Sequence, residues 1–395
     1  TKTLSSITQV NEDGFGDSSN RYAFAMESFN GKLYVGTSHI KKSIPGIYQF
    51  AGGNSLASEG AQMYVYDDTN NTWENVISGG FTDKTNFAVR KLKAIDDYLL
   101  AVSVNHEEGF EVWGTLNGND WVRLVSAGFH NKNNSSGRGI TKFGDFVYIT
   151  TENRKSGAEL WRCSSENIKT AIKEQNSPDS LKHWQKVGDK GFGDSLNFWF
   201  SDLLVFEEEL YVGTMNNVRG FSLFKSNDGI KFQEIVKRGV NSRFNHAAML
   251  LTEFNGELYV STMNWVKGFS VFVMQKRNNE PFLHPVLMNG FNSPYNAYVW
   301  QMCEFKGRLY AGTFQNSLLG LRLGMFSLYS TANGRDWEIE SDNAFASPGG
   351  TFSQYIRKEL GDYGIRTMKV HNDHLFIGTA TAYNSCKVYC ADSQQ

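Results

Sequence analysis

One nine-residue segment recurs seven times along the chain and constrains the fold more than any other feature. The copies read FNGKLYVGT from Phe29, IDDYLLAVS from Ile95, FGDFVYITT from Phe143, FEEELYVGT from Phe206, FNGELYVST from Phe254, FKGRLYAGT from Phe305 and HNDHLFIGT from His371. Each copy combines a two-residue turn with alternating apolar residues, which is the pattern of a β-hairpin. The copies begin 48 to 66 residues apart, a period that suits four strands per repeat.

A third and a fourth strand are expected after each copy. Six fourth strands follow their own repeat, but the chain stops after the third strand of the seventh, at CKVYCADSQQ. The missing copy is ITQVNEDGF, at residues 7–15. We therefore expect one all-β domain over residues 1–395, a seven-bladed β-propeller with four-stranded antiparallel blades. Residues 7–15 would close the ring as the outer strand of the last blade, which removes free sheet edges.

Three insertions interrupt the repeat period. Residues 40–61 and 345–361 are expected on one rim, because loops between second and third strands emerge beside the loops that join blades. Residues 164–183 are expected on the opposite face. Their segment SSENIKTAIKEQ predicts a short helix that begins at a serine cap.

Repeated polar residues precede and follow each copy. Nine residues before each copy lie Asn20, Asn86, Asn134, Asn197, Asn245, Asn296 and Asp362, and Asp17, Asp83 and Asp194 lie three residues earlier still. Asn and Asp bond neighbouring backbone groups in turns, so we expect a structural role, with a structural calcium site as the alternative and no other cofactor. Two residues after the end of each copy lie His39, Asn105, Asn153, Asn216, Asn264, Gln315 and Thr381. We expect these to bond between blades, and we also consider Asn153 as a ligand contact.

Function is expected where equivalent positions differ. Four residues after the repeated Asn, three repeats carry Arg90, Arg138 and Arg366. Guanidiniums at one level near a narrow axis repel one another unless counter-charges or an anionic ligand compensate them. Blade carboxylates such as Glu152 would serve as counter-charges. Alternatively, the arginines hold a carboxylate, sulfate or phosphate.

Aromatic and ionisable side chains are expected on the same rim. Trp199, Tyr298 and Trp300 either pack between blades or offer stacking faces to a sugar or apolar ligand. The candidate acid/base groups are His39, His246, Tyr22 and Tyr363. His106 is a further histidine with a suitable intrinsic pKa. No metal-ligand motif is evident.

The turns TLNGNDW, SNDGIKF and TANGRDW resemble a shortened Asp-box, the hairpin found in sialidase-like propellers. This resemblance covers the hairpins only and implies a fold, because Asp-boxes occur in propellers of many functions. Sialidases are six-bladed and carry an N-terminal arginine motif that this sequence lacks, so none of their residues is carried over. Seven-bladed polysaccharide lyases that act on uronic acids are similar by fold alone. They use His or Tyr as base and Arg against the carboxylate.

Composition narrows the classes of partner. The chain has 39 basic and 41 acidic residues, so no global field attracts nucleic acid or an anionic membrane, and no apolar run is long enough for membrane insertion. The four cysteines show no zinc spacing and are expected to be buried thiols. The oligomeric state and the compartment stay open, with a secreted or periplasmic location favoured if a signal peptide has been removed.

Two functions from different classes follow from these patterns. The first is an arginine-containing pocket at the channel mouth that binds an anionic small molecule or acidic saccharide. If it is an enzyme, it is a lyase or hydrolase acting on a carboxylated substrate. The alternative is a non-catalytic interaction propeller whose rim insertions contact a protein or glycan.

Overall fold

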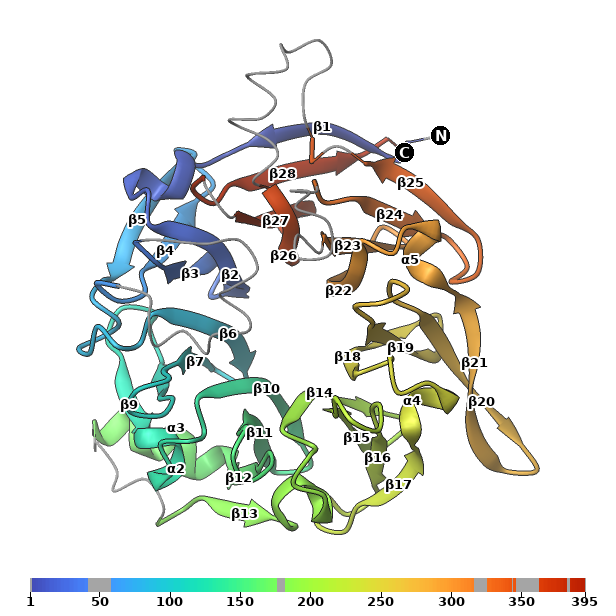
Figure 1. Cartoon of the computed structure of the whole chain (residues 1–395). Helices are drawn as coiled ribbons and strands as arrows, with labels where there is room; N and C mark the ends of the chain where they lie inside the picture. Colours follow the sequence, from blue (N-terminus) through green and yellow to red (C-terminus); the bar gives the residue numbers. More distant parts are fainter. Residues whose placement is uncertain are drawn as a thin grey trace. The chain divides into compact units, whose positions relative to one another are not determined.

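A computed structural model describes residues 2–41, 58–175, 182–315, 325–342, 344–345, 362–381 and 384–394. The chain is predominantly antiparallel β structure and divides into two compact units (Figure 1). Unit 1 comprises Thr1–Ala88, Trp265–Phe269 and Val286–Gln395, and unit 2 comprises Val89–Asn264 and Ser270–Pro285.

Unit 1 contains three sets of four strands. The first set is β2 (Asn20–Phe29), β3 (Lys32–His39), β4 (Met63–Asp67) and β5 (Thr72–Ile77). The second is β22 (Asn296–Phe305), β23 (Arg308–Gln315), β24 (Leu328–Thr331) and β25 (Trp337–Ser341). The third joins both termini: β26 (Asp362–His371), β27 (His374–Thr381), β28 (Val388–Ser393) and β1 (Leu4–Gln9).

Unit 2 is built mainly from four further sets. These are β6 (Ala88–Ile95), β7 (Tyr98–Val104), β8 (Val112–Thr115) and β9 (Val122–Val125); β10 (Ser136–Phe143), β11 (Phe146–Glu152), β12 (Leu160–Ser164) and β13 (Gln185–Val187); β14 (Trp199–Phe206), β15 (Glu209–Met215), β16 (Leu223–Ser226) and β17 (Gln233–Val236); and β18 (Ala247–Phe254), β19 (Glu257–Met263), β20 (Val271–Arg277) and β21 (Glu280–Leu287). Each predicted hairpin therefore forms the first and second strands of a set. The second strands are the most buried, as in β7, where every residue is buried.

The N-terminal strand pairs antiparallel with β28, with Leu4 opposite Ser393 and Gln9 opposite Tyr389 (Figure 1). The predicted pairing is confirmed, but the predicted bounds of 7–15 are wrong. The strand begins at Leu4, and residues 13–16 form the 3-10 turn η1 (Asp13–Gly16). Buried Glu340 contributes to this arrangement by accepting a hydrogen bond from the backbone N–H of Thr3 at 3.0 Å.

The last two residues of each predicted fourth strand form a turn and not a strand. They are Gly-Phe in five repeats, Gly239–Val240 in one and Ala344–Phe345 in one. Both residues have positive φ angles, for example 58° at Gly128 and 61° at Phe129. In five repeats the pair lies in a one-turn element: η1, α2 (Ala127–His130), η2 (Lys190–Gly193), α4 (Arg238–Asn241) and α5 (Asn289–Asn292). A Cβ at Gly128 would lie 2.6 Å from the Asn134 carbonyl oxygen, so glycine is required there.

The repeated asparagines stabilise these turns. In six repeats the side-chain amide donates to the carbonyl of the turn glycine six residues earlier, as from Asn134 to Gly128 at 2.8 Å and from Asn20 to Gly14 at 3.0 Å. The expected structural role is confirmed. The bond compensates for the left-handed backbone of a bulky residue, which is otherwise unfavourable.

The Asp-box-like hairpins are also structural. Asn117 Oδ1 accepts the backbone N–H groups of Asn119 and Asp120, each at 2.8 Å. Asp228 accepts those of Ile230 and Lys231 in the equivalent turn at 2.8 and 2.9 Å. These backbone hydrogen bonds are the main cause of the lowered pKa of Asp228, about 2.

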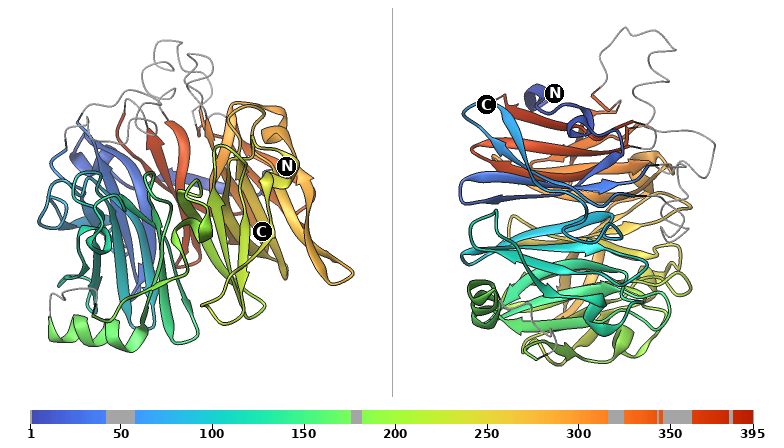
Figure 2. Two further views of the ribbon diagram at one scale, coloured as in Figure 1. Left: turned by 60° about the horizontal axis from the view of Figure 1, so that its bottom comes forward. Right: turned by 90° about the vertical axis from the view of Figure 1, so that its left-hand side faces the viewer.

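The predicted helix within 164–183 is confirmed as α3 (Ser165–Glu174), which Ser164 caps by accepting the backbone N–H of Asn167 at 3.1 Å (Figure 2). Lys169 pairs with Asp97 at 2.6 Å, beside the β6–β7 turn. The helix therefore lies at the end of β6 that is remote from Arg90. Most of the insertions at 40–61 and 345–361 lies outside the described residues.

Candidate functional site

Four strands of unit 2 bring a group of charged side chains together. Arg90 is near the start of β6 and Arg138 near the start of β10, while Glu152 ends β11 and Arg154 follows it. Val104 pairs with Ser136, and Glu152 pairs with Trp199, so adjacent repeats meet at these strand ends. We call Arg90, His106, Arg138, Glu152 and Arg154 the Glu152 cluster.

Glu152 is the centre of this cluster. Its Oε2 lies 3.4 Å from Arg138 Nη1 and its Oε1 lies 3.1 Å from Arg154 Nε. The Arg138 guanidinium also stacks over the Trp199 ring, 3.6 Å from the centroid. The side chains of Arg138 and Glu152 are only 3% and 6% exposed, whereas that of Arg154 is 43% exposed. Arg138 is thus a buried anchor, and Arg154 is accessible to solvent.

Electrostatics keep Glu152 ionised. Burial raises the pKa of its carboxyl, but the charges of Arg138, Arg154 and Arg90 outweigh burial and hold the pKa at about 2. Burial lowers the pKa of His106, and Arg154 and Arg90 lower it further against the opposing effect of Glu152. His106 is therefore neutral at pH 7.

Arginine side chains dominate the charge of the cluster. Within these five residues three guanidiniums act on one carboxylate. A second carboxylate, that of buried Asp202, acts on Arg138 and on neighbouring Lys91. Asp202 accepts the backbone N–H groups of Leu203 and Leu251, and burial raises its pKa. The counter-charge expected from sequence is confirmed for Arg138, which pairs with Glu152.

Arg366, the third predicted arginine, belongs to unit 1 and has aromatic neighbours. Its guanidinium lies 4.2 Å from the Phe24 centroid and 5.0 Å from the Trp300 centroid. The Tyr298 ring stacks on Phe314 with centroids 4.5 Å apart, and Trp300 meets Tyr298 edge-on at 5.1 Å. The ring faces of buried Tyr298 and Trp300 are used in packing, which argues against a ligand-stacking role.

Tyr22 and Tyr363 are also buried in unit 1, and their hydroxyls hydrogen-bond to each other. They lie in the same aromatic group, with Tyr22 also edge-on to Trp300 at 5.7 Å. Buried hydroxyls that bond each other are poorly placed to exchange protons with a substrate. The predicted acid/base roles of Tyr22 and Tyr363 thus find no support in this arrangement.

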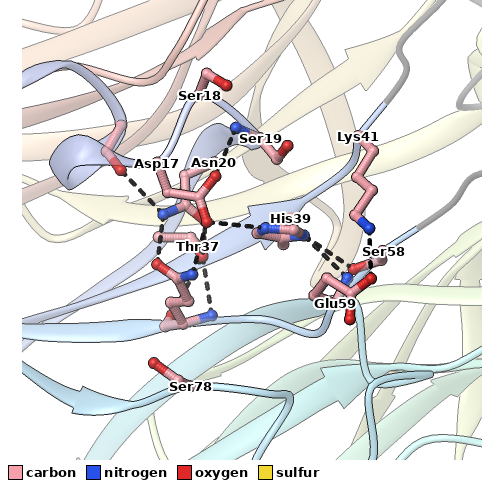
Figure 3. Close-up of polar contacts among 12 residues, drawn as sticks. Asp17, Ser18, Ser19, Asn20, Thr37, His39, Lys41, Ser58, Glu59 and Ser78 are labelled. Atoms are coloured by element: carbon pink, nitrogen blue, oxygen red, sulfur yellow. Dashed lines mark hydrogen bonds and ion pairs between the residues drawn. The ribbon is translucent and has the colours of Figure 1, made fainter.

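The two predicted histidines differ in their surroundings. His246 lies just before β18, burial lowers its pKa, and its Nδ1 has no hydrogen-bond partner among the described residues. His39 ends β3 and contacts Asp17 and Ser58 (Figure 3). Of the predicted acid/base groups, His39 therefore has the partners that such a role requires.

Asn153 is a scaffold residue. Its Nδ2 donates to Asn134 Oδ1 at 3.0 Å, and its Oδ1 accepts the backbone N–H groups of Lys155 and Ser156. It is fully buried, so we remove it from the candidate ligand contacts. The predicted bonding between repeats occurs here through the backbone, since the N–H of Asn153 donates to the Phe198 carbonyl of the next repeat at 2.8 Å, whereas the side chain bonds Asn134 of its own repeat.

Sequence reasoning missed Arg154 and Ser58. Arg154 directly follows the repeated amide position, where the residue type varies among the repeats. Ser58 lies near the end of the 40–61 insertion, which has no repeat equivalent.

Among the described residues no group of three or more His, Cys, Asp or Glu side chains could hold a metal ion. Within those ranges no helix is long and apolar enough to cross a membrane.

No protein-family model and no curated protein matches the chain. Among solved structures, the extracellular domain of a hybrid two-component system protein from B. thetaiotaomicron has 11% identity and a TM-score of 0.55. Raptor from Chaetomium thermophilum has 10% identity and a TM-score of 0.55. A protein assigned as a 6-phosphogluconolactonase, from Bacteroides uniformis, has 9% identity and a TM-score of 0.50.

These matches cover 98%, 100% and 81% of this chain, and 42%, 29% and 84% of the respective structures. The chain thus spans less than half the length of the first two proteins. At such identities the likeness concerns the fold alone. It indicates a propeller-like β protein.

Proposed function

We propose that the Glu152 cluster binds the anionic group of a small molecule or acidic saccharide. The observation that carries this proposal is the convergence of three guanidiniums, two of them on partly exposed side chains, on one buried carboxylate. Partly exposed Arg90 and Arg154 would contact the anion. Buried Arg138, which Glu152 and Trp199 hold in place, would contribute positive electrostatic potential to the site.

Guanidinium groups favour this ligand class because their planar donors match carboxylate, sulfate and phosphate oxygens. Glu152 restrains the orientation of Arg154 through the 3.1 Å contact, so less side-chain freedom is lost on binding. Partly exposed Trp199 lies beside the same guanidiniums and gives the site an apolar border. Such a border suits a sugar ring that carries an acidic group.

The propeller itself remains part of the proposal. We propose that the seven repeats form seven blades in one ring, closed by the β1–β28 pairing. The propeller-like neighbours and the seven equivalent strand sets support this arrangement. The alternative, an interaction propeller acting through its rim insertions, stays a prediction from sequence, because residues 42–57 and 346–361 lie outside the described ranges.

A thermal-shift screen tests the anion site. Wild-type protein is compared with Arg90→Ala and Arg154→Ala in carboxylated, sulfated and phosphorylated small molecules and oligosaccharides. The matched control is Arg123→Ala, which removes a partly exposed arginine that pairs with Glu111 at 3.3 Å in the same unit. Binding to the folded state raises the unfolding temperature. The proposal expects an anion-specific shift in wild type and control that both cluster variants lose.

The screen also tests the wider prediction for Arg366. Loss of the shift in Arg366→Ala would support the predicted role of Arg366 in anion binding. An unchanged shift would limit anion binding to the Glu152 cluster. No shift with any anion in the wild type would refute anion binding.

A further inference from the structure

Asp17, His39 and Ser58 form a hydrogen-bonded series in unit 1 (Figure 3). His39 Nε2 lies 3.0 Å from Asp17 Oδ2, and His39 Nδ1 lies 3.2 Å from Ser58 Oγ. The imidazole is only 4% exposed, whereas Asp17 and Ser58 are partly exposed. A carboxylate, an imidazole and a hydroxyl in this order resemble the arrangement that activates a serine nucleophile.

The other repeats show that His39 departs from the scaffold pattern. At the equivalent position Asn153 donates to Asn134, and Asn216 donates to Asn197, each at 3.0 Å. In the first repeat, Asn20 keeps the scaffold bonds from Thr37 at 2.9 Å and to Gln62 at 2.7 Å, whereas the imidazole makes its contacts elsewhere. It contacts Asp17 and the end of the insertion.

The hydrogen bonds define the tautomer of His39. The backbone N–H of Glu59 donates to Nδ1 at 3.2 Å, so Nδ1 carries the lone pair. Nε2 then carries the proton and donates it to Asp17. Hydrogen bonds from Ser19 and His39 keep the pKa of Asp17 below its ordinary value despite the opposing effect of burial. Nδ1 is therefore the basic nitrogen, and the Ser58 hydroxyl lies beside it.

A backbone donor also faces the hydroxyl oxygen. The N–H of Gly60 donates to Ser58 Oγ at 2.9 Å, which stabilises the negative charge that develops as the hydroxyl loses its proton. Ser58 is thus placed between a base and a donor, and it is accessible to solvent.

We propose that Ser58 is a nucleophile toward carboxylic esters, with His39 as its general base and Asp17 as the positioning residue. The Ser58 Oγ attacks the ester carbonyl carbon while its proton passes to His39 Nδ1. The bond from that carbon to the alcohol oxygen breaks, and the alcohol leaves with the proton from His39. Water then attacks the acyl carbon while one of its protons passes to His39 Nδ1. The bond from that carbon to Ser58 Oγ breaks, the carboxylic acid leaves, and His39 returns the proton to Ser58. The proposal is independent of the Glu152 cluster, since every residue named lies in unit 1.

The chain contains an internal comparison. Ser28 Oγ lies 2.8 Å from His371 Nδ1, and His371 Nε2 lies 3.2 Å from Asp68 Oδ2, near the other end of β2. That contact with Asp68 lacks hydrogen-bond geometry, so the imidazole is not oriented as His39 is. We therefore expect Ser58, and not Ser28, to react.

The test is covalent labelling of the full chain with a fluorophosphonate probe, followed by peptide mapping, together with hydrolysis of p-nitrophenyl acetate. The variants are Ser58→Ala and Asp17→Asn. The control is Ser78→Ala, which removes an exposed hydroxyl bonded to Asn75 in the same unit. Thermal unfolding of each variant verifies that it is folded.

The proposal predicts label on Ser58, loss of label and of hydrolysis in Ser58→Ala, and no change in Ser78→Ala. Asp17→Asn should slow labelling by about 100-fold or more while the protein stays folded, because the amide favours the wrong tautomer. An unlabelled wild-type chain, label on Ser28, or equal labelling rates in wild type and Asp17→Asn would each overturn it.

Discussion

Glu152→Gln is the substitution that examines the charged cluster most closely. The amide keeps the volume of the side chain but removes the charge that Arg138, Arg154 and Arg90 share. A pKa held at about 2 in place of 4.5 corresponds to about 3 kcal/mol of stabilisation. Loss of one partner from a buried ion pair costs a similar amount, about 3–5 kcal/mol. We expect the free energy of unfolding at pH 7, measured by urea denaturation, to fall by about 3 kcal/mol.

The pH dependence has a defined sign. The folded protein lowers the pKa of Glu152, so its contribution is complete above pH about 5 and is lost as the pH falls toward about 2. The difference between wild type and Glu152→Gln should therefore shrink across this range. An undiminished difference at pH 3, or equal stabilities at pH 7, would refute the electrostatic reasoning.

The same variant links stability to binding. Without Glu152 the three guanidiniums lose the carboxylate that they share, so an added anion should bind more tightly and restore part of the lost stability. Arg123→Ala, which changes an ion pair outside the cluster, should show neither effect. Weaker anion binding by Glu152→Gln would show that Glu152 orients the site more than it competes for it.

Three further predictions concern the scaffold. Asn134→Ala leaves the Gly128 carbonyl and Glu159 without their amide partner, so it should lower the free energy of unfolding by at least about 2 kcal/mol, whereas exposed Lys132→Ala should not. Ser164→Ala should cost about 1 kcal/mol in the same assay through loss of the α3 cap, and an unchanged value would contradict the capping role. Burial raises the pKa of every cysteine thiol, so a thiol reagent at pH 8 should react only slowly with the native protein. After denaturation the reagent should label all four cysteines, and fewer than four labelled cysteines would show a disulfide.

The hairpins and their order could be predicted because turn chemistry and apolar alternation are local. The Gly-Phe turns could not, since phenylalanine favours strands and its left-handed backbone depends on an asparagine five residues farther along. The same turn explains why the N-terminal strand ends at Gln9 and not at Phe15, because Gly14 and Phe15 belong to η1.

The site was predictable in part. Differences between repeats identify Arg138 and its counter-charge Glu152, whereas Arg154 follows the repeated amide at a position where the residue type varies among the repeats. Tyr298, Trp300 and Trp199 are all aromatic residues that the repeat pattern places on one rim. Only burial separates the packed Tyr298 and Trp300 from the partly exposed Trp199. Ser58 reaches His39 because the chain returns after an insertion, and that return path has no sequence signal.

The central claim, anion binding by the Glu152 cluster, is tested most directly by calorimetric titration of the best anion from the thermal-shift screen. The account predicts saturable binding to wild type, affinity at least about tenfold weaker for Arg154→Ala through loss of one charge-assisted contact, and unchanged affinity for Arg123→Ala. Equal affinities of all three proteins for the anion would contradict it.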